Sequence, residues 1–82
     1  MYYRIKEERR KELQDGRTLL YIADLSGYSR QYITYVFNGK MLATKESAIK
    51  ILRSIADNSL SLTIRINQQG IDEVLNYFFE KM

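Results

Sequence analysis

Two short helical segments meet at Gly27, and this arrangement leaves few folds open to the chain. Thr18 and Ser29 each precede a run of helix-compatible residues, and a hydroxyl at that place accepts a hydrogen bond from a free amide of the first turn. The predicted helices run from Leu19 to Leu25 and from residue 30 to Phe37. Glycine adopts positive φ without steric cost, so Gly27 suits a tight turn between them. Two short helices joined in this way are typical of a helix-turn-helix.

The packing that this motif needs is also present in the sequence. Ala23 is a small residue at the place where the two helices would touch, four positions before Gly27. Apolar residues at helical spacing on both segments would form the rest of the contact. The predicted core of the motif therefore consists of Ile22, Ala23, Gly27, Tyr28, Ile33 and Val36.

Helices are also predicted on both sides of the motif. Residues 2–15 are rich in good helix formers and place Tyr2, Ile5 and Leu13 on one stripe, with Gly16 as a plausible end. Thr44 is a candidate cap for a fourth helix that reaches about Asp57 and carries apolar residues at core spacing. Residues 1–58 are therefore expected to form a mostly α, four-helix domain.

The hydrophobic periodicity changes after residue 58. Leu60, Leu62, Ile64 and Ile66 alternate with polar residues, as in a half-buried strand, and helical spacing returns over 71–82. An alternative interpretation is that 60–66 is a helix that packs into the core. A lone strand is unstable in water. We therefore expect residues 59–82 to form a strand–helix extension that pairs with a second copy through Leu60, Leu62, Ile64, Ile66 and Phe78.

The composition excludes most kinds of catalysis. The 82 residues include no cysteine and no histidine, so thiolate nucleophiles, disulfides, Ser-His triads and the usual zinc sites are ruled out. No carboxylate pair or lysine cluster stands out from ordinary surface charge. We expect a binding module rather than an enzyme, with no metal and no cofactor. No apolar run approaches the ~18–20 residues that cross a bilayer, so no membrane contact is expected.

The net charge of +3 divides unevenly along the chain. Residues 1–53 hold eleven basic and six acidic residues, which gives +5, whereas residues 54–82 hold two basic and four acidic ones, which gives −2. A basic front half is compatible with a polyanionic partner such as nucleic acid, although a solvated surface would carry a similar charge.

The segment Leu19–Lys40 resembles the helix-turn-helix of lambda-repressor-like, Cro/C1-type (XRE) regulators of phages. Ile22-Ala23, the Ser26–Ser29 turn, Ile33 and the Val36–Lys40 end carry the resemblance, which extends over about residues 4–57. It implies a regulator, expected to be a repressor of a phage or mobile element, in the cytoplasm or nucleoid of a bacterial host. It also implies a homodimer on a palindromic operator. Leu19 departs from the family, which usually has glutamine there, and Arg17 replaces an apolar residue.

The resemblance further implies which residues would touch double-stranded DNA. The second motif helix of this family lies in the major groove, and its exposed residues face base edges. The implied base contacts are Ser29, Arg30, Gln31, Thr34 and Tyr35. Arginine pairs with guanine and glutamine with adenine through two hydrogen bonds each. The implied phosphate contacts are Arg17, Thr18, Asn38 and Lys40, together with backbone amides near Gly39.

A protein partner is the alternative to DNA. Leu19, the modest charge and the tyrosines of the motif suit a protein interface, where tyrosine is enriched. On this hypothesis the chain is an inhibitor built on the same scaffold, such as an antirepressor or a phage counter-defence protein of the anti-CRISPR type.

Overall fold

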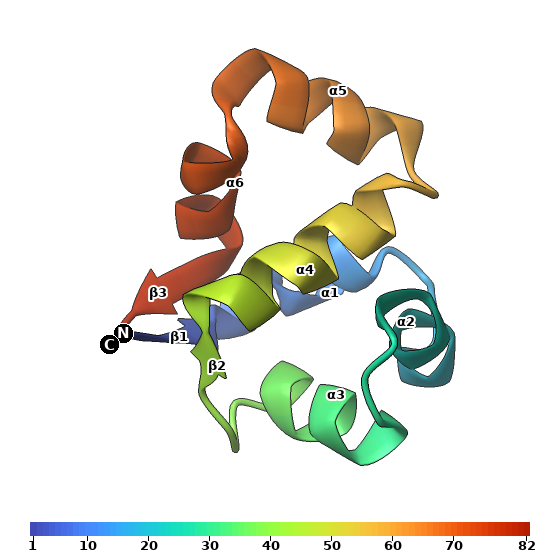
Figure 1. The fold of residues 1–82 in the computed structure, drawn as a ribbon, viewed down its shortest axis with the longest axis vertical. Coiled ribbons are helices and arrows are strands. Elements are labelled where there is room, and N and C mark those ends of the chain that lie inside the picture. Colours follow the sequence, from blue (N-terminus) through green and yellow to red (C-terminus); the bar gives the residue numbers. More distant parts are fainter.

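A computed structural model describes all residues, 1–82, and shows a mostly helical chain with a small sheet (Figure 1). The mostly α fold class is confirmed. None of the helices combines the length and apolar character needed to cross a membrane. In chain order the elements are β1 (Tyr2–Ile5), a 3-10 turn η1 (Glu7–Arg9), α1 (Arg10–Gln14), α2 (Leu19–Ser26), α3 (Arg30–Phe37), β2 (Ala43–Thr44), α4 (Lys45–Ala56), α5 (Leu60–Gln69), α6 (Ile71–Phe78) and β3 (Phe79–Lys81).

The two helices of the predicted motif, α2 and α3, are confirmed, and both begin at the expected caps. The hydroxyl oxygen of Thr18 accepts a hydrogen bond from the amide of Tyr21 at 3.1 Å, and that of Ser29 accepts one from Tyr32 at 3.1 Å. Gly27 ends α2 with φ of 78°, in the left-handed region where a side chain would be strained.

The predicted fourth helix is confirmed as α4, which runs diagonally through the centre of the molecule (Figure 1). Thr44 caps it, because its hydroxyl oxygen accepts a hydrogen bond from the amide of Ser47 at 3.1 Å. Its buried residues are Ala48, Ile51, Leu52, Ile55 and Ala56, at the spacing that the sequence indicated. These side chains face α2 on one side and the C-terminal helices on the other.

The prediction of one helix over residues 2–15 is wrong for its first part. Residues 2–5 form β1, and only Arg10–Gln14 is α-helical. Tyr3 and Ile5 point into the core while Tyr2 is exposed, which is the alternation of a strand rather than the stripe of a helix. β1 is the central strand of the sheet, so the pairing partners on both sides decide its conformation.

The predicted strand over residues 60–66 is also wrong, because this segment is the first part of α5. The alternative interpretation, a helix, is the correct one. Four apolar residues at every second position are also two pairs spaced four apart, and such pairs share a helix face. Leu62 is buried and Ile66 half-buried on one face, whereas Leu60 and Ile64 are exposed on another. Ser59 caps the helix through the amide of Leu62.

The predicted C-terminal helix is correct for Ile71–Phe78 and wrong beyond it, where residues 79–81 form β3. β3 pairs antiparallel with β1, with Tyr3 opposite Lys81 and Ile5 opposite Phe79. β2 pairs antiparallel with the other edge of β1, so the sheet order is β2-β1-β3. The two ends of the chain therefore lie side by side (Figure 1).

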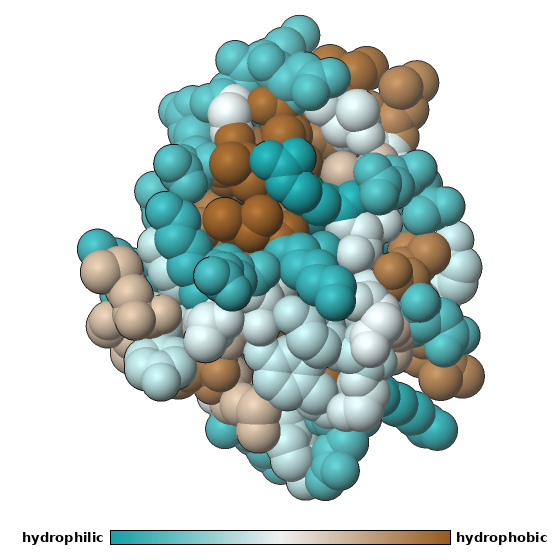
Figure 2. All heavy atoms as spheres, in the orientation of Figure 1, coloured by the Kyte–Doolittle hydropathy of each residue, from teal (hydrophilic) through white to brown (hydrophobic).

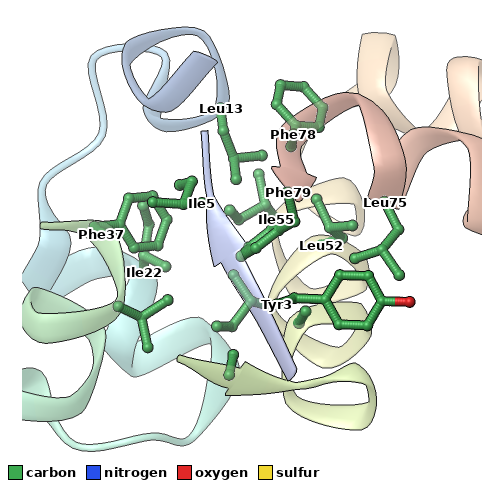
Figure 3. Close-up of a cluster of buried hydrophobic side chains, with 14 of the residues drawn as sticks. Tyr3, Ile5, Leu13, Ile22, Phe37, Leu52, Ile55, Leu75, Phe78 and Phe79 are labelled. Carbon is green, nitrogen blue, oxygen red and sulfur yellow. The ribbon is translucent and has the colours of Figure 1, made fainter. Parts of the chain in front are cut away.

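A single core joins the helix-turn-helix to the C-terminal segment. Nineteen buried apolar residues form one cluster, and they come from both sides of residue 58. Figure 3 shows Ile22 and Phe37 on one side of β1 and Leu75, Phe78 and Phe79 on the other. Residues 59–82 are thus packed into the same core as the motif.

Candidate nucleic-acid interface

The exposed face of α3 collects the residues that the sequence nominated for base contacts. Arg30, Gln31 and Tyr35 are exposed, and Thr34 is half-buried. With Asn38, which caps the helix, they lie within an arc of about 140° at 3.6 residues per turn. The opposite face carries the buried Ile33, Val36 and Phe37, so packing against the core fixes which face of α3 is presented to solvent.

The electrostatics of this surface favour an anionic partner. No aspartate or glutamate occurs between Asp24 and Glu46, whereas Arg30, Lys40 and Lys45 lie in that stretch. The five ion pairs of the molecule involve neither Arg30 nor Lys40. Their charges are consequently not neutralised by contacts within the chain.

Three of the predicted base-contact residues, Ser29, Gln31 and Tyr35, take part in hydrogen bonds within the chain. The Ser29 hydroxyl oxygen is engaged as the cap of α3. The side-chain amide of Gln31 donates from Nε2 to the hydroxyl oxygen of Tyr35 at 3.2 Å. No side-chain hydrogen bond or ion pair occupies Arg30 or Thr34, so both can turn toward a ligand.

The predicted phosphate contacts differ in how available they are. Asn38 and Lys40 are exposed just beyond the end of α3, and Thr18 is exposed at the start of α2. The guanidinium of Arg17 is engaged within the chain, because it donates to the Gln14 carbonyl at 3.3 Å and lies 3.8 Å from the Asp15 carboxylate.

The expectation that backbone amides near Gly39 bind phosphate is wrong. The amide of Asn38 donates to the Thr34 carbonyl and that of Gly39 to Val36. The next two amides, of Lys40 and Met41, both donate to the carbonyl of Tyr35. This turn therefore uses its amides to close α3.

The residues assigned to the core of the motif lie together between α2, α3 and α4. Ile22, Ala23, Ile33 and Val36 are buried, and Gly27 lies in the exposed turn. Tyr28 is half-buried, and its hydroxyl donates to the hydroxyl oxygen of Ser47 at 3.0 Å. This hydrogen bond ties the turn of the motif to α4.

Two basic residues outside the predicted set also support α3. Arg10 donates to the carbonyl of Phe37 at 3.4 Å, where a cation stabilises the negative end of the helix dipole. The ammonium of Lys50 lies 4.8 Å from the centre of the Tyr28 ring. Neither residue carries a local sequence signal, because each reaches α3 or its preceding turn from another element. Arg10 and Asn38 also line a groove of about 430 Å³ between the start of the chain and the end of α3.

The residues predicted to form the dimer contact are not on one surface. Leu62 and Phe78 are buried in the core of their own chain, so they are not available to a partner. Ile66 is half-buried, and only Leu60 and Ile64 are well exposed. The predicted strand pairing between copies is therefore corrected by the helical structure of α5.

The hydropathy of the surface separates two regions of the molecule. Apolar surface gathers between α4, α5 and α6, while the surface over α3 is mainly pale or hydrophilic (Figure 2). No group of three or more aspartate, glutamate, histidine or cysteine side chains is arranged to hold a metal ion.

A family model described as helix-turn-helix matches residues 5–55 of the chain. The matched segment begins at the end of β1, includes α2 and α3, and ends just before the last residue of α4. No curated protein and no solved structure has a significant match to the chain.

Proposed function

Because the chain belongs to the Cro/C1-type (XRE) helix-turn-helix family, it is a DNA-binding regulator, and we propose that it represses transcription. We place it in a phage or mobile element, with a palindromic operator bound by two copies. Occupation of a promoter by a small bound domain blocks transcription sterically, which is the simplest regulatory effect of such a protein.

The observation that carries this proposal is the face of α3. It is exposed, contains no carboxylate, and presents Arg30 and Gln31 in the first turn. In this family fold the second motif helix enters the major groove with its N-terminal residues toward base edges. The Arg30 guanidinium matches the two acceptors of guanine, and a glutamine amide matches the donor and acceptor of adenine.

A selection from random double-stranded oligonucleotides tests the proposal. The expected result is enrichment of one motif with twofold symmetry and a steep loss of binding as salt rises, because phosphate contacts release counterions. Placing that motif over a promoter should then lower transcription in a purified system. Enrichment of no sequence would contradict DNA reading, and increased transcription would contradict repression.

The dimer that we propose uses the outer face of the sheet. Tyr2, Arg4 and Glu80 alternate with buried residues and point outward, next to the exposed Leu42 and Met82. Within one chain the Arg4 guanidinium and the Glu80 carboxylate form an ion pair, with Nη2 and Oε1 3.4 Å apart. Across a twofold axis, Arg4 of one copy can face Glu80 of the other, so the surface is self-complementary in charge as an isologous contact requires.

The shape of the molecule also favours a side-by-side dimer. The molecule measures 31 × 26 × 22 Å, so two copies in contact are large enough to place equivalent helices at the ~34 Å that corresponds to one DNA turn. An end-to-end dimer through α5 would direct the two α3 helices away from each other, because α5 and α3 lie at opposite ends of the long axis (Figure 1).

Sedimentation of two matched variants tests this surface. Leu42→Glu places a charge on the proposed contact, and Leu60→Glu places one on the outer face of α5. We expect the first variant to be monomeric and the second to remain a dimer like the wild type. A wild-type protein that is monomeric at all concentrations, or a dimer lost only in Leu60→Glu, would contradict the proposed surface.

One observation favours the second candidate, a protein-binding inhibitor. Leu20 and Tyr21 are 51% and 44% exposed at the start of α2, and exposed apolar residues of this size suit a protein contact. A pull-down with Leu20→Ser as the matched control distinguishes this candidate. Capture of one stoichiometric partner by the wild type, lost in the variant, would support it, and capture of none would count against it.

A further inference from the structure

The hydrogen bond between Gln31 and Tyr35 has a consequence for the way α3 reads DNA. Both side chains are exposed, and they are four residues apart on the same face. Long side chains of an α-helix lean toward its N-terminus, so Tyr35 reaches back over the first turn. There its hydroxyl oxygen accepts a hydrogen bond from Gln31 Nε2 at 3.2 Å.

This contact leaves the Gln31 amide with a defined set of free groups. A glutamine amide has two N–H donors and one oxygen that accepts. One N–H is used by Tyr35, and one donor and the acceptor remain. These two lie side by side when Tyr35 takes the N–H that points away from the amide oxygen. Adenine presents the complementary pair in the major groove, an N6 donor beside the N7 acceptor. In that arrangement the Gln31 amide can make a two-point contact with adenine while the bond to Tyr35 is kept.

We propose that Tyr35 is a positioning residue that holds the Gln31 amide ready to read an adenine. This inference rests on the proposed function, which it deepens by assigning a base to one position of α3. Tyr35 acts here through Gln31 instead of touching a base itself. An exposed glutamine otherwise samples many rotamers, and ordering it before binding reduces the entropy lost on contact.

The test compares Tyr35→Phe, Gln31→Ala and the double variant in binding to the selected motif. Tyr35→Phe removes only the hydroxyl and keeps the ring. We expect it to reduce the preference for adenine at one position by about 2- to 12-fold, the range for one net hydrogen bond, and to leave non-specific binding unchanged. Gln31→Ala should abolish the preference at that position. The double variant should then match Gln31→Ala.

The possible results separate failure of the proposed role of Tyr35 from failure of the proposed function. A wild-type protein that enriches no sequence overturns the proposed function, and this inference with it. A selected motif whose adenine preference survives Tyr35→Phe overturns the inference alone. A double variant weaker than Gln31→Ala would show that Tyr35 makes its own contact, which also overturns it. Equal melting temperatures of the wild type and Tyr35→Phe serve as the folding control.

Discussion

Replacement of Phe79 by alanine should destabilise the whole chain, including the helix-turn-helix. Phe79 is the first residue of β3, lies opposite Ile5 of β1 and is 0% exposed. Removing a buried phenylalanine side chain costs about 3–5 kcal/mol, because transfer energy is lost and a cavity remains. A chain of this size has a total stability of about 4–12 kcal/mol. The substitution therefore removes a large part of the free energy that holds α2 and α3 in place.

The assay is thermal unfolding followed by far-ultraviolet circular dichroism and by tyrosine fluorescence. Each kcal/mol shifts the midpoint of a domain this small by about 4–8 °C, so we expect a decrease of at least about 12 °C. Both probes should report one transition, because the helices pack on one core that also contains Tyr3 and is contacted by Tyr28, Tyr32 and Tyr77. Leu60→Ala is the matched control in the same C-terminal segment. Leu60 is 77% exposed, and such substitutions change stability by about 0.5 kcal/mol or less.

Two results would contradict a single folding unit that includes residues 59–82. One is a Phe79→Ala variant whose helical signal melts at the wild-type midpoint. The other is two separated transitions, with the motif surviving after the C-terminal segment has unfolded. Either would show that residues 59–82 are an appendage rather than part of the folding unit.

Three further predictions concern the turn of the motif, the cap of α2 and a contact between α6 and α1. Gly27→Ala should lower the free energy of unfolding by about 1–2 kcal/mol, because alanine is strained at a φ of 78°. The new methyl would meet only the end of Lys50, at 3.9 Å, so the cost comes from the backbone and not from a clash. An unchanged midpoint in chemical denaturation would contradict this. Thr18→Ala should lower the free energy of unfolding by about 1 kcal/mol, because the cap of α2 is lost, whereas Thr18→Ser should keep most of that stability. Tyr77→Phe, which removes a hydroxyl that donates to Glu12, should lower the melting temperature by less than Phe79→Ala does, because this hydrogen bond is exposed to solvent; a larger effect would contradict this.

The local structure of the motif could be predicted because its signals are local. Thr18, Ser29 and Thr44 each precede a helix that they cap, and Gly27 adopts the positive φ that its turn requires. The exposed face of α3 follows from the same periodicity, since Ile33 and Val36 can only be buried on one side. These features depend on residues within about one helical turn of each other.

The sheet and α5 could not be predicted because their determinants are distant or ambiguous. β1 and β3 pair residues 2–5 with residues 79–81, and neither segment shows more than two alternations by itself. The Leu60–Ile66 pattern satisfies both a strand and a helix, and only packing against α4 and α6 distinguishes them. Likewise, the engagement of Arg17 with the end of α1 depends on a loop conformation that residue type does not reveal.

The most direct test of DNA reading by α3 is the base preference of Arg30→Ala in the oligonucleotide selection. Arg30 is exposed and its charge is unpaired, so the substitution should leave the fold unchanged. We predict that the preference for guanine at one position, worth about 1–3 kcal/mol of binding free energy against another base, is lost. The rest of the motif should persist. Lys11→Ala, an exposed basic residue on α1, serves as the control and should preserve the motif. An identical motif for Arg30→Ala and the wild type would contradict base recognition by Arg30 and, with it, DNA reading by this face of α3.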